Sequence, residues 1–373
     1  MMRIIGNRLL KLAPVLFLVS LATFFLVELV PGDPAIRLLG NDATPEDVAR
    51  IRMELGLDRP VLERYTEWLG NALQGDFGNS LLKPAFSVRE LLVQSLPITL
   101  QLATMGILIA LIVAIPTALW AAYREGSGFD RASNALTSAL ISIPSFVAAL
   151  LLAFLFVSNP TVPRTAIGIL GVAAGLWALW TARPGAAPGG RFRVRWLLIG
   201  VGILALTALV TNKFPAFNRT GFSRITAEEG LSENLRTAFL PALTIALTEI
   251  AVFTRLLRSD LIATLQEDYI LSARAKGMSP GKVLRKEALR PSSFSLVTLL
   301  GVSLGRAIGG TVIVETVFGI QGVGRLVVSD GVTPGDFPIV QGGVLLIAVF
   351  YVFINLLVDL SYLYLDPRVR DAR

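Results

Sequence analysis

Long runs without charged residues recur along the chain and indicate its fold class. Leu91–Tyr123, Ala132–Pro163 and Phe337–Val358 contain no Asp, Glu, Lys or Arg. Such runs are too long for the core of an ordinary globular domain, whereas a helix needs about 20 mostly apolar residues to cross a bilayer. The pattern therefore predicts an all-α fold, a polytopic bundle of membrane-spanning helices.

Eight segments are predicted as membrane spans, with boundaries defined to within a few residues. The fourth and fifth lie at the short limit for crossing a bilayer, and a hairpin in the membrane interface is the alternative for these two. In chain order the segments are about Leu9–Val30, Ser95–Tyr123, Ala132–Val157, Thr165–Ala182, Trp196–Thr211, Thr237–Leu257, Ser293–Val317 and Phe337–Tyr364.

The basic residues predict how these spans are oriented. The net charge is +7, and the loops on one side of the predicted bundle hold more than half of the 34 Lys and Arg residues. Short cytoplasmic loops of membrane proteins are enriched in Lys and Arg. An even number of spans then places both termini in the cytoplasm. This distribution explains the positive charge without a nucleic acid partner.

The residue types that are missing exclude several kinds of chemistry. The chain has no Cys and no His, and it contains no G-x-x-x-x-G-K-[ST] sequence. Thiolate and imidazole catalysis, and the metal sites built from those groups, are therefore excluded, as is a P-loop for nucleotide phosphates. We expect no catalytic residues, no metal ligands and no cofactor on this chain, and we expect that it is not an enzyme.

The predicted spans divide the chain into five regions. These are the first span in 1–31, an extracytoplasmic helical segment in 32–94, spans two and three in 95–158, the short hairpin with an outside loop in 159–235, and the remaining core in 236–373.

Two short helices are predicted in the segment 32–94. Thr44 is placed as the N-cap before Pro45, and Gly56 follows the end of the first helix. The second helix is predicted to be amphipathic, with one apolar face formed by Leu62, Tyr65, Trp68, Leu69, Ala72 and Leu73.

The loop 258–292, between the sixth and seventh spans, is the longest and most charged of the predicted inside loops. A helical period covers Tyr269–Ala275, is interrupted at Gly277–Pro280 and resumes over Gly281–Leu289. A helix, a glycine turn and a second, basic helix would project from the membrane as a compact knob. Such a knob suits the docking of a cytoplasmic protein, because a helix held in a groove transmits rigid-body motion.

Tyr269–Gly277 resembles the "EAA" loop of bacterial ABC importer permeases, in the form found in the oligopeptide/dipeptide/nickel group. The family's glycine, second alanine and later leucine match Gly277, Ala273 and Leu289. The chain departs from the general pattern at three positions, which are Leu271, Ser272 and Pro291. By this resemblance the ATPase-coupling residues are Tyr269, Ala273, Arg274, Ala275, Lys276, Gly277 and Leu289.

Four further stretches resemble sequences of the same group, in the same order along the chain. They are Val30–Pro34, Gly75–Ser80, Glu315–Gly324 and Asp366–Arg370. The resemblance leaves out about 159–231. Because members of this group usually have six spans, it implies that the hairpin 165–211 is an insertion into a six-span core.

The resemblance implies a permease subunit of an ATP-driven, binding-protein-dependent importer, forming half of the pathway for peptides or related small solutes. The implied partners are a homologous second permease, two cytoplasmic ATPase subunits that bind ATP and Mg, and an extracytoplasmic solute-binding protein. The implied location is the bacterial inner membrane. The alternatives are a secondary transporter that acts alone and a membrane scaffold that transports nothing.

Charged residues inside the predicted spans are candidates for the pathway or for a subunit interface. Glu249 and Arg306 lie deep in their spans, and Glu315 lies near the end of its span, where solvation or a backbone contact is the alternative. A charge inside a membrane normally faces protein or water. The seventh span also carries small residues that permit close helix packing, namely Gly301, Ser303, Gly305, Ala307, Gly309 and Gly310.

Overall fold

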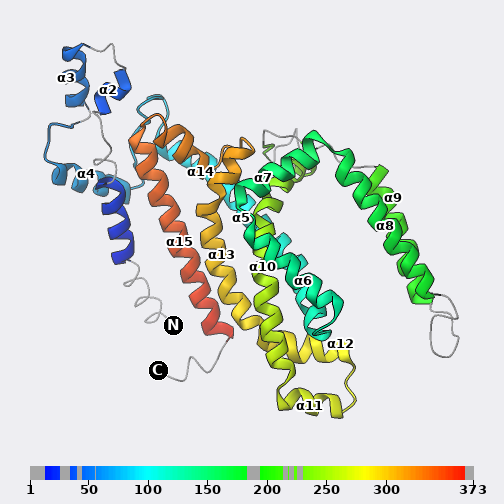
Figure 1. Ribbon diagram of the computed structural model, residues 1–373. Coiled ribbons are helices and arrows are strands. Elements are labelled where there is room, and N and C mark those ends of the chain that lie inside the picture. Colours follow the sequence, from blue (N-terminus) through cyan, green and yellow to red (C-terminus); the bar gives the residue numbers. More distant parts are fainter. Residues whose placement is uncertain are drawn as a thin grey trace. The chain divides into compact units, whose positions relative to one another are not determined.

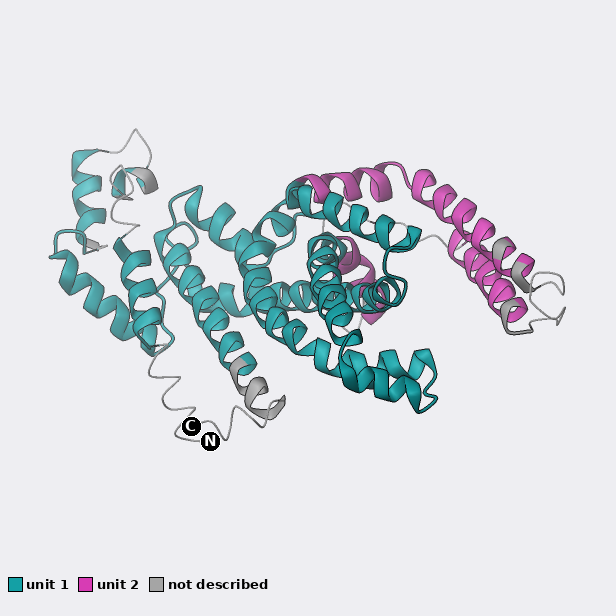
Figure 2. Cartoon of the chain, turned by 60° about the horizontal axis from the view of Figure 1, so that its bottom comes forward, with its two compact units in different colours: residues 1–146, 241–373 teal, residues 147–240 magenta. Residues whose placement is uncertain are grey.

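The computed structural model describes residues 13–25, 34–39, 44–54, 56–182, 194–212, 217, 222–224 and 230–365. Within these residues the chain is helical, and the one extended pairing is an isolated bridge between Asn79 and Ser87. The predicted all-α class is therefore confirmed (Figure 1). The chain forms two compact units, Met1–Phe146 with Pro241–Arg373 as unit 1 and Val147–Leu240 as unit 2 (Figure 2).

The described residues form a series of helices. In chain order they are α2 (Pro34–Leu39), α3 (Pro45–Glu54), α4 (Val61–Leu73), α5 (Val88–Tyr123), α6 (Gly128–Ser142), α7 (Ser145–Ala153), η1 (Phe154–Ser158), α8 (Thr161–Ala182), α9 (Val194–Asn212), α10 (Gly230–Leu265), α11 (Asp268–Ala275), α12 (Pro280–Lys282), η3 (Val283–Ala288), α13 (Leu289–Val317), α14 (Val323–Arg325), η4 (Leu326–Val332) and α15 (Phe337–Leu365).

Five helices in the described residues are long and apolar enough to cross a membrane, or six if α6 and α7–η1 form one broken span. The five are Val88–Tyr123, Thr161–Trp180, Gly230–Leu265, Pro280–Val317 and Phe337–Val358. Two shorter apolar helices cover Ala13–Phe25 and Leu197–Asn212, within the first and fifth predicted spans. A multi-pass membrane protein is thus supported, and the count of eight spans stays a prediction.

The third predicted span, Ala132–Val157, is not one continuous helix. α6 ends at Ser142 and α7 begins at Ser145, with Ile143 in an extended conformation (φ −85°, ψ 117°) between them. Pro144 causes the break, because proline has no N–H and disfavours a helical conformation of the residue before it.

The core of unit 1 forms where α5 meets α10. Ala110, Ala114, Ala118 and Ala122 recur every four residues along α5 and are buried against the large side chains of α10, which are Phe253, Leu257 and Leu261. Small residues on one helix let a second helix approach closely, which is how membrane helices pack when both faces are apolar.

Some of the glycines of α13 allow close packing against α15, whereas others have open space around them. A Cβ atom added to Gly301 would collide with Val358, and one added to Gly305 would lie 2.6 Å from Cδ2 of Tyr351. Both contacts lie on α15, which runs beside α13 (Figure 1). Gly309 and Gly310 have no heavy atom within 4 Å of an added Cβ, so the packing of this chain does not require them to be glycine.

The two short helices predicted after the first span are present. The Thr44 hydroxyl accepts from the Asp47 N–H at 3.2 Å and caps α3, and Gly56 follows with φ +63°. In α4 the predicted apolar face is only partly correct, because Leu62 and Leu73 are exposed while Tyr65 is buried. Tyr65 packs edge-on against Phe24, and its hydroxyl lies 2.9 Å from that of Ser20, so α4 rests on the helix Ala13–Phe25.

Unit 2 contains a pair of tightly packed helices, α8 and α9. An added Cβ on Gly171 would collide with Thr207, and one on Gly175 would lie 2.6 Å from Cγ of Leu204. α8 and α9 therefore pack closely side by side, and their being an inserted hairpin stays a prediction.

Gly301→Ala should destabilise the protein. The new methyl group meets the stiff, β-branched Val358, and overpacking of this kind costs about 1–3 kcal/mol. Gly309→Ala is the matched control in the same helix, because its methyl group enters open space. We expect the melting temperature in detergent to fall for Gly301→Ala and to stay the same or rise slightly for Gly309→Ala. Equal melting temperatures would contradict the α13–α15 contact.

Candidate functional site

The loop between α10 and α13 has the predicted order of helix, turn and helix. α11 covers Asp268–Ala275, and α12 and η3 begin at Pro280 and continue directly into α13. Figure 1 shows α11 and α12 beyond the ends of α10 and α13, at the end of unit 1 opposite to α14. We call residues 268–288 the coupling loop, after the role that the resemblance implies.

Gly277 makes the turn in this loop. Its φ is +79°, a left-handed conformation that glycine adopts at little energetic cost. The Gly277 N–H donates to the Arg274 carbonyl at 2.9 Å, and the Met278 N–H donates to the Ala273 carbonyl at 3.3 Å. These two bonds form a Schellman motif, which satisfies the last carbonyls of α11 and fixes the direction in which the chain leaves it.

The coupling loop is anchored to the helix bundle on one side and exposed on the other. Ile270, Val283 and Ala288 are fully or almost fully buried in the same apolar core as the α5 alanines and α10. Of the predicted coupling residues, Ala273 is buried and Leu289 half-buried, whereas the exposed members are Tyr269, Arg274, Ala275, Lys276 and Gly277. The loop is therefore a rigid extension of the bundle with a basic outer surface.

Tyr269 connects the two halves of the loop. Its hydroxyl donates to the carbonyl of Glu287 at 3.4 Å. Partial burial raises the pKa of the Tyr269 phenol, and the nearby carboxylates of Glu267 and Glu287 raise it further. The phenol therefore keeps its proton at physiological pH and remains a hydrogen-bond donor across the loop.

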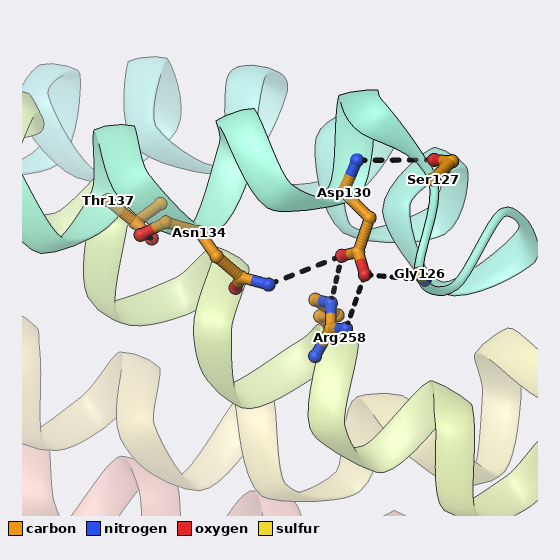
Figure 3. A network of polar contacts seen from close by, with 6 residues as sticks. All are labelled: Gly126, Ser127, Asp130, Asn134, Thr137 and Arg258. Atoms are coloured by element: carbon orange, nitrogen blue, oxygen red, sulfur yellow. Dashed lines mark hydrogen bonds and ion pairs between the residues drawn. The ribbon is translucent and has the colours of Figure 1, made fainter.

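A buried carboxylate, Asp130, joins α6 to α10 (Figure 3). Arg258 binds it with two nitrogens, Nε at 2.5 Å from Oδ1 and Nη2 at 2.7 Å from Oδ2. The Gly126 N–H donates to Oδ2 at 2.9 Å, and Asn134 donates to Oδ1 at 3.3 Å. A bidentate arginine–carboxylate pair with additional donors is among the strongest polar contacts in proteins.

Sequence reasoning missed this pair. Asp130 and Arg258 each lie next to the end of a predicted span, where a charge needs no explanation beyond solvation. A local signal was present, because Ser127 followed by Asp130 is the spacing of a helix N-cap with an acid in the first turn. Ser127 is indeed the N-cap of α6 and accepts from the Asp130 N–H. The partner on α10 has no such local signal.

Glu249 and Arg306 contact each other within this chain. Nη2 of Arg306 lies 2.8 Å from Oε1 of Glu249, and the Ser303 hydroxyl donates to Oε2 at 2.7 Å. Glu249, on α10, is almost fully buried, whereas the Arg306 side chain on α13 is 56% exposed. The sequence left open whether the two residues meet, and the structure brings them together.

Glu315 belongs to a separate cluster at the other end of α13. It is fully buried, and it accepts from the Thr99 hydroxyl on α5 at 2.7 Å and from the Arg325 N–H at 2.9 Å. Thr99 in turn accepts from the Val323 N–H at 2.9 Å. An added Cβ on Gly322 would collide with the carboxylate, so glycine is needed there. Glu315 thus contacts the backbone of Arg325, and its role in the pathway or at an interface stays a prediction.

The Gly75–Ser80 stretch, which carries part of the resemblance, also ends in a buried polar contact. The Ser80 hydroxyl donates to Oδ2 of Asp336 at 2.5 Å, just before α15 begins. The stretch therefore connects the segment before α5 to the start of α15. The Asp366–Arg370 stretch and residues Val30–Asp33 lie outside the described residues, and only Pro34 of the Val30–Pro34 stretch is described.

Arg258→Ala should destabilise the protein strongly. It leaves Asp130 buried without its cation, and breaking a buried ion pair in this way costs about 3–5 kcal/mol. Arg255→Ala is the matched control one turn earlier on α10, since Arg255 is exposed and, among the described residues, bonds only the exposed Ser138. Thermal unfolding of the detergent-solubilised protein measures both. A similar loss of stability in the two variants would show that the Asp130 pair has no special role.

The chain is similar over nearly its whole length to several known proteins. The chain is 32% identical over 364 residues to a probable peptide ABC transporter permease protein of Sinorhizobium fredii, covering 98% of both chains. It is 30% identical over 374 residues to a di/tripeptide transport system permease protein of Pseudomonas aeruginosa (100% of both) and 28% identical over 367 residues to a dipeptide transport system permease protein of Alkalihalophilus pseudofirmus (98% of both).

Two family models cover almost the whole chain. The model of the N-terminal part of the binding-protein-dependent transport system membrane component matches residues 1–103, and that of the inner membrane component itself matches residues 114–371. The second match alone spans well over half of the 373 residues. The chain therefore belongs to the family of inner membrane components of binding-protein-dependent transport systems, as a permease subunit and not as a catalytic one.

Proposed function

We propose that this chain forms half of the translocation pathway of an ATP-driven importer for peptides. The names of the relatives support peptides as the substrate class. The observation that carries the mechanism is the coupling loop, whose buried side joins the bundle core while its basic side is exposed. Two ATPase subunits hold ATP and Mg, a homologous permease forms the other half of the pathway, and an extracytoplasmic protein delivers the peptide.

In this mechanism the coupling loop is the part that the ATPases move. Ile270 and Val283 share one apolar core with α5 and α10. Because packed cores are close to incompressible, a displacement of the loop is passed to those helices and not absorbed within the loop. Closure of the ATPases around ATP would thereby tilt the helices between inward-open and outward-open arrangements.

The topology that this mechanism requires places the coupling loop and both termini in the cytoplasm. The excess of Lys and Arg in the loops on that side supports the orientation. We further propose eight spans, in which α8 and α9 are a hairpin added to a six-span core. The Ala13–Phe25 helix would then be part of the first span.

Gly277→Val should uncouple ATP hydrolysis from uptake. A β-branched residue is strongly disfavoured at φ +79°, so the Schellman turn changes and the exposed end of α11 is displaced. Gly202→Val on α9 is the matched control, since Gly202 lies outside the coupling loop, has open space around its Cβ position and has no positive φ. The assay measures peptide uptake and ATP hydrolysis by the assembled importer in proteoliposomes.

We expect Gly202→Val to keep both activities. We expect Gly277→Val to lose most uptake while hydrolysis continues, or to lose the ATPases on purification. Normal uptake by Gly277→Val would contradict the role of the coupling loop.

A further inference from the structure

Arg306 has unused hydrogen-bonding capacity. In the part of the chain that the structure describes, only its Nη2 makes hydrogen bonds, to Glu249 and, at 3.3 Å, to Ser303. The N–H donors on Nε and Nη1 have no acceptor there, and the side chain is 56% exposed. Glu249 thus fixes the guanidinium in place while much of it faces away from the bundle.

Arg306 is exposed near the middle of α13, far from both ends of the helix. With a rise of about 1.5 Å per residue, it lies roughly 25 Å from the start of α13 at Leu289 and roughly 16 Å from its end at Val317. Arg306 is therefore far from both ends of a membrane-crossing helix. A cation with free donors is costly against lipid at that depth, so such residues face water or polar groups.

The residues around Arg306 form one continuous exposed face of α13. Its exposed members, which we call the Arg306 face, are Val302, Arg306, Gly309, Gly310 and Ile313. Gly309 and Gly310 lie one turn beyond Arg306 and have open space around their Cβ positions. By contrast, Gly301 and Gly305 are occupied by the contact with α15. The face therefore combines a cation with an adjacent flat surface that the described residues leave uncovered.

We propose that the Arg306 face lines the translocation pathway and that Arg306 binds the C-terminal carboxylate of the peptide in transit. This inference rests on the proposed function of the chain as a peptide permease. Every unmodified linear peptide carries that carboxylate whatever its side chains. A guanidinium binds a carboxylate through charge-assisted hydrogen bonds, and the flat glycine surface leaves room for the peptide main chain.

The pair with Glu249 suits transient binding. The carboxylate of Glu249 neutralises part of the Arg306 charge, so a second carboxylate is held less tightly than by an unpaired arginine. A site in a transport pathway must bind favourably enough to admit its substrate and weakly enough to release it. Ser303, which donates to Glu249, positions this pair and is not itself proposed to touch the peptide.

The first experiment tests whether the Arg306 face is accessible to water. Since the chain has no native cysteine, Val302→Cys and Ile313→Cys each place a single thiol on the Arg306 face. Val349→Cys on α15 is the matched control, because Val349 is 41% exposed, close to 43% for Val302 and 42% for Ile313. Each chain is assembled with its partner subunits in lipid nanodiscs and treated with a water-soluble thiol reagent, with and without a non-hydrolysable ATP analogue.

We expect both thiols of the Arg306 face to be labelled in at least one nucleotide state and the Val349→Cys thiol in neither. If the thiols of the face stay unreactive in both states, the face is covered by lipid or by the second permease, and the proposal is overturned.

The second experiment tests the carboxylate. Labelling of Ile313→Cys is measured with a dipeptide at millimolar concentration and with the same dipeptide carrying a C-terminal amide. No binding protein is present, so it cannot select between the two peptides. We expect the dipeptide to slow labelling several-fold and the amide to leave it unchanged. Equal protection by both peptides, or protection by neither, would overturn the proposal. This test needs no substitution at Arg306.

Variants of Arg306 add a control for charge and geometry. In the Ile313→Cys background, Arg306→Gln should abolish protection by the dipeptide, and Arg306→Lys should retain part of it. Uptake of the same dipeptide by the unmodified importer with its binding protein is measured separately. Absence of that uptake would overturn the proposed function, whereas normal uptake with unprotected thiols would overturn only the carboxylate site.

Discussion

A carboxylate inside a membrane protein must find its counter-charge or its hydrogen-bond donors within the protein, and this constraint organises the long helices of unit 1. Three buried acids each join a different pair of elements. Asp130 binds Arg258 between α6 and α10, Glu249 binds Arg306 between α10 and α13, and Glu315 binds Thr99 between α13 and α5. Apolar packing alone would leave the rotation and register of these helices less defined, because lipid is as apolar as the side chains between them.

The same helices carry the coupling loop at one end. α10 leads into α11, and η3 leads into α13, so the loop joins two helices that are also held together by the Glu249–Arg306 pair. The core around Ile270 extends this connection to α5. A force applied to the exposed side of the loop therefore acts on a connected set of helices. Among these helices, α13 carries Arg306, a cation whose Nε and Nη1 donors have no acceptor among the described residues.

Most of the fold could be predicted from the sequence, because membrane helices leave a strong local pattern. Uncharged runs located the long helices, and glycine and proline in Gly277–Pro280 located the turn in the coupling loop. The break inside the third predicted span was not predicted, because Pro144 was read as part of an apolar run, although proline and the residue before it interrupt a helix. Pro144 was thus a local signal of the break, and it was overlooked.

The polar contacts could be predicted only in part. Glu249 and Arg306 stood out as charges deep in spans, but their contact depends on how α10 and α13 are rotated against each other, which no local pattern specifies. Asp130 was missed because a charge near the end of a span has an ordinary explanation. The roles of Gly301 and Gly305 against α15, and of Gly309 and Gly310 on the open face, likewise depend on which helix lies beside each.

The most direct test of the central claim is site-specific photo-cross-linking from the coupling loop. A single cysteine at Leu271, which lies exposed on α11, would carry a benzophenone group in the assembled importer. The account predicts a cross-link to a subunit that hydrolyses ATP. Failure to cross-link such a subunit in any nucleotide state, or labelling of that cysteine from outside intact cells by an impermeant reagent, would contradict it.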